Sequence, residues 1–191
     1  MDMPRSPRRP TKGQRALADA LARGEAALGP GVETLPASVY IDPDRYEAEQ
    51  RAIFDKVPHL LAPSALLPHN NTAIAHDGYG VPLIISRDGN GPLHVMANVC
   101  RHRGTRLIED DEVVSSKRIV CPYHAWTYGS DGGLMAIPRA ECFPGIDKSD
   151  RPLMHFASVE SGGFIWFSRD PAARFGNIFT LPEGMGPFRT S

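Results

Sequence analysis

Two short stretches that each pair a cysteine with a histidine constrain this chain most. CRHRGTRL at 100–107 holds Cys100 and His102, and CPYHAW at 121–126 holds Cys121 and His124. Thiolate and imidazole are the side-chain ligands that hold iron and zinc in proteins. Three cysteines in 191 residues do not support a disulfide framework. The first question is therefore which metal the two stretches would hold.

The order of the four residues separates two kinds of metal site. A zinc finger groups its ligands by type, two cysteines and then two histidines, usually with the histidines on a helix. Here the order alternates, with one cysteine and one histidine in each stretch. If the two stretches face each other, the cysteines meet on one side and the histidines on the other. This arrangement suits a [2Fe–2S] cluster whose first iron takes two thiolates and whose second takes two imidazoles, with a zinc-binding module as the alternative.

The chain around these stretches favours short strands. Eighteen prolines and eighteen glycines indicate many turns. Two apolar runs, at 81–86 and 93–99, flank a turn rich in glycine and asparagine, and this pattern predicts a hairpin. GSDGG at 129–133 predicts a second hairpin, and 156–160 with 163–168 a third. In the first hairpin we expect His94 at the surface or sheet edge, and not as a ligand.

Helices are expected only near the N-terminus. Residues 1–15 are basic and proline-rich and are expected to be disordered, whereas 16–28 favours a helix that GPG at 29–31 would end. A second helix is predicted from Pro43 to Val57, capped by Asp42 and stopped by Pro58. Its apolar face would consist of Tyr46, Ile53, Phe54 and Val57.

Composition limits the classes of partner. The formal net charge of −1 gives no reason to expect nucleic acid or an acidic membrane surface. No apolar run approaches the roughly 18 residues that a membrane-spanning helix needs. The N-terminal residues lack the apolar core of a secretory signal, so a cytoplasmic location is expected.

The motif CRHRG…CPYHAW resembles the Rieske [2Fe–2S] motif. The flanking sequence, from about Tyr40 to Phe167, is similar to the N-terminal Rieske domain of the large (α) subunit of ring-hydroxylating oxygenases. The resemblance implies a mainly β fold: a Rieske-type antiparallel β-sandwich with cluster-binding loops, preceded by N-terminal helices. The Rieske domain with its leading helical segment would span 39–170. Residues 1–38 would form a tail with a short helix, and 171–191 a truncated linker or the start of a missing catalytic domain.

The resemblance also implies roles for individual residues. Cys100 and Cys121 would bind the buried iron, and His102 and His124 the outer one. Four further residues would contact or enclose the cluster, Gly104 through a tight turn and Trp126 by excluding water: Arg103, Gly104, Tyr123 and Trp126.

Two departures from the respiratory Rieske proteins narrow the subclass. Thr105 and Tyr123 stand where those proteins carry an extra pair of bonded cysteines. Ala125 and Trp126 replace a glycine and a serine whose hydroxyl raises the potential. With fewer hydrogen-bond donors to sulfur, we expect a potential near the low end of the Rieske range, about −150 mV. The remaining thiol, Cys142, is expected to pack as a small apolar residue.

The implied function is electron transfer within an oxygenase. Electrons would pass from a ferredoxin or flavin reductase to a non-haem iron held by two histidines and a carboxylate in a separate domain. Other α subunits and a small β subunit are further possible partners. A stand-alone Rieske ferredoxin is the alternative, and the segment at 40–66 favours the oxygenase because carriers lack it. No close histidine pair with a carboxylate is expected among the remaining histidines: His59, His69, His76, His94 and His155.

Basic residues near the two stretches suggest how an electron donor would bind. They could form a rim for an acidic ferredoxin or reductase. The alternative is that neighbouring carboxylates neutralise them. The basic residues are Arg101, Arg103, Arg106, Lys117 and Arg118, and the acidic ones are Glu109, Asp110, Asp111 and Glu112.

Overall fold

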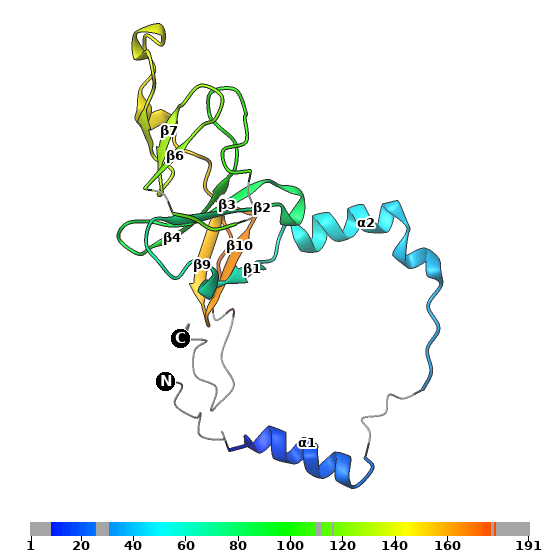
Figure 1. The fold of residues 1–191 in the computed structure, drawn as a ribbon. Helices are drawn as coiled ribbons and strands as arrows, with labels where there is room; N and C mark the ends of the chain where they lie inside the picture. Colours follow the sequence, from blue (N-terminus) through cyan, green and yellow to red (C-terminus); the bar gives the residue numbers. More distant parts are fainter. Residues whose placement is uncertain (1–8, 26–30, 110–111, 116, 177, 179–191) are drawn as a thin grey trace.

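The computed structural model describes residues 9–25, 31–109, 112–115, 117–176 and 178. Within them the fold is mainly β and antiparallel, as predicted (Figure 1). Its helices are α1 (Lys12–Ala22), α2 (Pro43–Glu49) and a π-helical turn, η2 (Gln50–Phe54), with short 3-10 turns between strands. The strands are β1 (His59–Pro63), β2 (Thr72–His76), β3 (Leu83–Arg87), β4 (Leu93–Ala97), β5 (Val114–Ser115), β6 (Arg118–Val120), β7 (Thr127–Gly129), β8 (Leu134–Ala136), β9 (Ala157–Ser161) and β10 (Phe164–Ser168).

The strands form three sheets. The four-stranded sheet has the order β4-β3-β2-β5, and the other two have the orders β1-β10-β9 and β6-β7-β8. All three predicted hairpins are present, as β3–β4, β7–β8 and β9–β10. These hairpins were predictable because each is closed by local turn residues.

The four-stranded sheet is buried on both faces because successive side chains of a strand point to opposite sides. Leu83 and Ile85 of β3 enter one core, which they share with Phe167 of β10. Ile84 between them enters a second core, which also contains Cys100 and Cys121. The sheet therefore joins the part of the molecule that carries the two cysteines to the β1-β10-β9 sheet.

His94 lies at the end of the four-stranded sheet, as expected for an edge histidine. It is half-buried, and its Nε2 lies 2.8 Å from Oδ2 of Asp88 in the β3–β4 turn. Met96, two residues further along the same face of β4, is fully buried. The face of β4 that carries His94 is therefore open to solvent only at the beginning of the strand.

The second predicted helix is shorter than expected. Asp42 caps α2 by accepting hydrogen bonds from the N–H groups of Asp44 (2.9 Å) and Arg45 (3.3 Å). The α-helix ends at Glu49 and continues as the π-helical turn, whose last carbonyl, that of Phe54, lies 2.7 Å from Nε2 of His59. The proposed apolar face is wrong for three of its four residues, which are exposed: Tyr46, Ile53 and Val57.

The first helix lies earlier than the predicted 16–28. Thr11 caps α1 in a capping box with Gln14, so the helix starts inside the segment expected to be disordered. It ends at Ala22 because Gly24 adopts a φ of +69° and Glu25 donates its N–H to the carbonyl of Ala20. Residues 1–8 and 26–30 lie outside the described residues.

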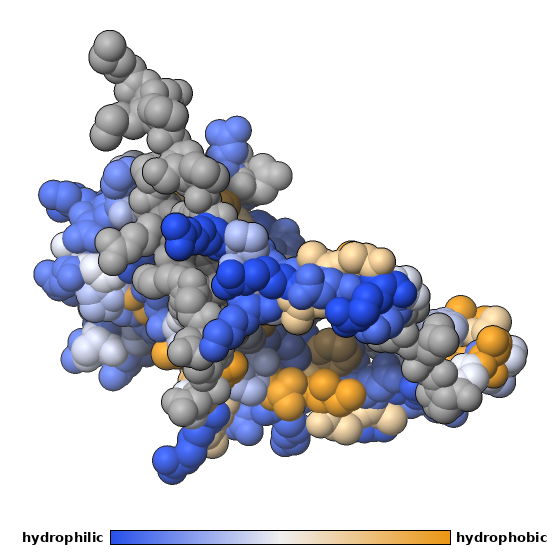
Figure 2. All heavy atoms as spheres, turned by 90° about the horizontal axis from the view of Figure 1, so that it is seen from below, coloured by the Kyte–Doolittle hydropathy of each residue, from blue (hydrophilic) through white to orange (hydrophobic). Residues whose placement is uncertain are grey.

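Helix α1 buries no side chain and lies apart from the sheets (Figure 1). Leu17 and Leu21 are exposed, and apolar residues lie open on this side of the molecule (Figure 2). In the part of the chain that the structure describes, no helix is long and apolar enough to span a membrane.

Candidate metal centre

The two predicted stretches form loops with the same hydrogen-bond pattern. In loop one (100–105) the N–H of Cys100 donates to the carbonyl of Thr105, at 2.8 Å. In loop two (121–126) the N–H of Cys121 donates to the carbonyl of Trp126, at 2.9 Å. The carbonyl of each cysteine also accepts the N–H of the residue four positions later. Each loop is therefore a closed turn that begins at its cysteine.

The fifth position of each loop requires a left-handed backbone. Gly104 has a φ of +76°, which explains the glycine of the first motif and agrees with its predicted turn role. Ala125 occupies the matching position in loop two with a φ of +54°. Its Cβ makes this conformation unfavourable, so loop two carries strain that loop one does not.

The two cysteines lie side by side in the core. Cys100 and Cys121 are 2% and 3% exposed, neither forms a disulfide, and both belong to one buried cluster. Burial, and to a smaller extent the Cys121 thiol, raises the pKa of Cys100. A buried thiol pair of this kind gains from a metal cation, which offsets the charge of the thiolates.

The two histidines form a second pair. The ring centroids of His102 and His124 are 4.8 Å apart. His102 stacks on the buried indole of Trp126 at 4.9 Å, and the ring of Phe143 meets His102 edge-on at 5.5 Å. Trp126 therefore covers one face of a candidate ligand and belongs to the core at the same time.

Each histidine has a buried nitrogen without a protein partner. Among the described residues four buried side-chain polar atoms lack a hydrogen bond, and two of them are Nδ1 of His102 and Nδ1 of His124. Burial, together with His124 and Arg103, lowers the pKa of His102, which favours the neutral ring that a metal binds. Because both residues are half-exposed while Nδ1 is buried, the open part of each ring lies on the Nε2 side.

The donor set fits a two-iron cluster better than a single ion. Within the described ranges, no three Cys, His, Asp or Glu side chains converge as one ion would require. Instead a thiol pair and an imidazole pair face the interior with open coordination positions. A [2Fe–2S] cluster with two thiolates on one iron and two imidazoles on the other matches these two pairs.

Tyr128 is a site residue that the sequence analysis did not identify. Its hydroxyl accepts the N–H of Arg101 at 2.9 Å and lies 3.3 Å from Sγ of Cys100. Burial raises the pKa of Tyr128, so the phenol keeps its proton and can donate it to the sulfur. The low midpoint potential expected from the sequence rested on few hydrogen-bond donors to sulfur, and Tyr128 was not among the donors considered. The alternation of β7 could have revealed it, since Trp126 and Tyr128 are two residues apart and both point inward.

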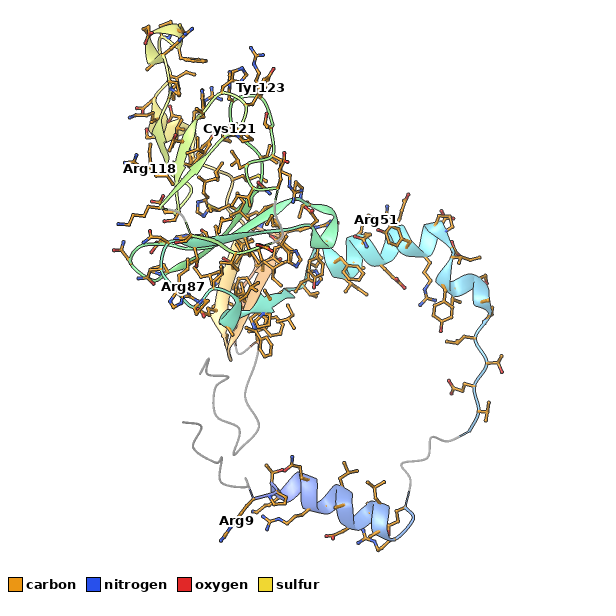
Figure 3. All side chains as sticks on the ribbon, viewed as in Figure 1. Arg9, Arg51, Arg87, Arg118, Cys121 and Tyr123 are labelled. Carbon is orange, nitrogen blue, oxygen red and sulfur yellow. The ribbon has the colours of Figure 1, made fainter. Side chains whose placement is uncertain are left out.

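The outer surface of the site is partly basic. Arg101 and Arg103 of loop one are exposed, and Tyr123 lies further out than Cys121 (Figure 3). Lys117 is also exposed, but it precedes β6, whose other end leads into loop two. Arg106, one of the basic residues predicted to bind an electron donor, forms a bidentate ion pair with Asp77, at 2.7 and 2.9 Å. Of the four proposed neutralising residues, Glu109 and Glu112 are exposed, and Asp110 and Asp111 lie outside the described residues.

One expectation about another residue needs correction. Cys142 is exposed in a 3-10 turn and does not pack as a small apolar residue. Among the remaining histidines, His94 and His155 approach edge-to-face at 5.7 Å, with Asp88 beside His94. In the portion described, these groups do not converge on a metal position.

Comparisons with known proteins agree with this geometry. The family model described as "Rieske [2Fe-2S] domain" matches residues 57–154. The chain is 35% identical over 147 residues to the anthranilate 1,2-dioxygenase large subunit of Acinetobacter baylyi, covering 75% of this chain and 30% of that protein. It is 31% identical over 140 residues to the carnitine monooxygenase oxygenase subunit of Escherichia coli K12, covering 73% and 37%.

Solved structures give the same relationship. The apo form of the quaternary ammonium Rieske monooxygenase CntA matches with a TM-score of 0.68 and 29% identity, covering 76% of this chain and 42% of the other. Naphthalene 1,2-dioxygenase from Rhodococcus sp. matches with a TM-score of 0.69 and 27% identity, covering 86% and 36%. The chain thus spans about a third of the length of the curated relatives that it matches. Because the family model covers half of the sequence and includes both loops, this chain belongs to the Rieske [2Fe–2S] domain family.

Proposed function

We propose that this chain is the electron-transfer domain of a Rieske oxygenase large subunit. It would accept electrons singly from a ferredoxin or flavin reductase and pass them to a non-haem iron of the oxygenase. One observation carries the proposal: paired buried thiols lie next to paired imidazoles whose Nδ1 atoms have no protein partner. A bound [2Fe–2S] cluster supplies a one-electron carrier at this position.

The proposal assigns a role to each ligand. Cys100 and Cys121 hold the buried iron, where their negative charge offsets the charge of the metal. His102 and His124 hold the outer iron through Nδ1, and their Nε2 edges face outward as the route between cluster and surface. Trp126 and Phe143 keep water from the His102 ring. Gly104 closes loop one, and Arg103 and Tyr123 line the outer side of the site.

An oxygenase domain is favoured over a stand-alone carrier by the segment before the motif. The likeness to naphthalene 1,2-dioxygenase covers 86% of the chain, which extends well beyond the family match at 57–154. It therefore takes in residues outside the core of strands and loops that an isolated carrier would need.

The electron acceptor in this proposal belongs to a larger assembly. Inter-subunit electron transfer is described for a quaternary ammonium Rieske monooxygenase that this chain resembles, with 27% identity. By analogy, the acceptor iron would lie in a neighbouring α subunit, with a small β subunit as a further possible component. The exposed edges of His102 and His124 would then face that neighbour.

Metal analysis and spectroscopy test the proposal directly. Protein purified without oxygen should be reddish-brown, contain iron and acid-labile sulfide in equal amounts, and give a Rieske-type EPR signal on reduction. Cys100→Ala and Cys121→Ala should abolish the signal. Cys142→Ala is the matched control and should leave it unchanged, because this thiol is exposed and outside the site. Colourless protein with stoichiometric zinc would contradict the proposal.

A further inference from the structure

The two loops are closed at their bases in different ways. Loop two lies between β6 and β7, which pair directly outside it through Val120 and Thr127. Loop one follows β4, but residues 106–109 on its far side form no strand. A different interaction must therefore fix the two ends of loop one relative to each other.

The side chain of Asn98 supplies this interaction. Its Oδ1 accepts the N–H groups of Leu107 (2.9 Å) and Ile108 (3.0 Å), and its Nδ2 donates to the carbonyl of Ile108 at 2.7 Å. Its own N–H donates to the carbonyl of Pro82 at 2.9 Å, which anchors it to the four-stranded sheet. The carboxamide thus makes the hydrogen bonds that a neighbouring strand would otherwise make.

The position of Asn98 makes these bonds hard to replace. The residue is 0% exposed, and Leu107 and Ile108 are also buried. Without the carboxamide, the two buried N–H groups would lose their partners and the carbonyl of Ile108 would lose one of its two donors. Arg106 adds a bond from Nε to the carbonyl of Ile108 at 3.0 Å, but its ion pair is with Asp77, which is exposed.

We infer that Asn98 is a positioning residue for Cys100 and His102. It holds loop one at the distance from loop two at which the thiol pair and the imidazole pair form. The contact of Tyr128 of β7 with Cys100 and Arg101 crosses between the loops, so it depends on the same placement. The inference rests on the proposed function, because it concerns the geometry of the cluster ligands.

Two variants separate positioning from simple stabilisation. Asn98→Leu keeps the number and branching of the side-chain heavy atoms and removes every side-chain hydrogen bond, and Asn98→Ser is a milder change. Both should release iron to a chelator about tenfold faster than wild type and alter the EPR line shape and midpoint potential. The matched control is Ser86→Ala, which removes another fully buried side-chain-to-backbone bond, from Ser86 to the Ser130 carbonyl. It should lower stability and leave the EPR spectrum and potential unchanged.

The outcomes discriminate between a positioning role and a purely stabilising role of Asn98. If the Asn98 variants lose stability as Ser86→Ala does, with an unchanged EPR spectrum and potential, Asn98 is structural only and the inference is overturned. Hydrogen exchange on the wild-type protein gives a test that needs no variant. The amides of Leu107 and Ile108 should exchange as slowly as those of β3, and fast exchange there also overturns the inference. Failure of the proposed function is distinct, because the wild-type protein would then show no Rieske signal.

Discussion

Gly104 and Ala125 occupy the same left-handed position in two matching turns, and this difference can be measured. A Cβ at Gly104 would meet no atom within 4 Å, so the cost of Gly104→Ala is that of the backbone alone. We expect Gly104→Ala to lower the free energy of unfolding by about 1 kcal/mol and Ala125→Gly to raise it by about 0.5–1 kcal/mol. Urea denaturation of the cluster-loaded variants measures both. Destabilisation by Ala125→Gly would show that its backbone is not strained.

A second prediction at the scale of single residues concerns the effect of Tyr128 on the midpoint potential of the cluster. The reduced state places more negative charge on Sγ of Cys100, so a hydrogen bond from the Tyr128 hydroxyl stabilises that state more than the oxidised state. Tyr128→Phe should therefore lower the potential by tens of millivolts, which corresponds to about 1 kcal/mol for one electron. Protein-film voltammetry measures the change. Tyr79→Phe is the control, since its hydroxyl bonds to the carbonyl of Leu60 away from the site; equal shifts in the two variants would refute the assignment.

At the scale of elements, local patterns were predictable and long-range contacts were not. The β3–β4 hairpin follows from its turn residues, and the cap of α2 from Asp42 and Pro43. The end of the π-helical turn that follows, η2, is held by His59, which bonds to the carbonyl of Phe54 and stacks between Phe54 and Tyr79. Its partner Tyr79 comes from another part of the chain, so no local pattern contains this contact.

The same distinction applies to the candidate site. Its four proposed ligands follow from a motif because each loop is a local turn. Alternation along the strand can indicate that Tyr128 points inward, but it does not reveal the bonds that Tyr128 and Asn98 make with atoms of loop one or of its far end. The end of α1 was missed for a different reason. Gly24 reads as a helix-interior residue in an alanine-rich run, although it forms the C-terminal cap.

The β3–β4 turn yields a prediction about stability and pH. Asp88 is buried, and its hydrogen bond to His94, followed by backbone N–H groups, lowers the pKa of its carboxyl. A carboxyl with a lowered pKa stabilises the fold above its unfolded-state pKa, and this contribution is lost as pH falls through the lower folded-state value. Asp88→Asn should cost about 1–2 kcal/mol at pH 7, and the cost should shrink as pH falls below about 3.9, the ordinary pKa of an aspartate.

Urea denaturation from pH 7 to pH 3 measures this contribution. The stability curves of wild type and Asp88→Asn should converge as pH falls. Asp19→Asn on the exposed helix α1 is the control and should run parallel to wild type throughout. A constant difference between wild type and Asp88→Asn would mean that the ionised carboxylate is not the stabilising group.

For the attraction of an electron donor, the distribution of charge over the whole molecule matters more than the net charge. The formal net charge of −1 cannot attract an acidic protein over long distances. Arg101 and Arg103 of loop one are nevertheless exposed, whereas Arg106 is paired with Asp77. Attraction of an acidic electron donor must therefore come from a few side chains close to the histidine edges, and salt screens such an attraction over about 10 Å at 0.1 M.

This local attraction predicts how electron transfer depends on ionic strength. The second-order rate of reduction by an acidic ferredoxin should fall as salt rises from low to physiological concentration, because screening removes the steering that brings the donor to the loops. Arg101→Gln and Arg103→Gln should slow reduction at low salt and flatten the salt dependence. Arg45→Gln removes an exposed charge on α2 and is the matched control, expected to behave as wild type. Stopped-flow absorbance of the cluster measures the rate. A wild-type rate that does not change with ionic strength would show that the donor does not bind through this basic surface.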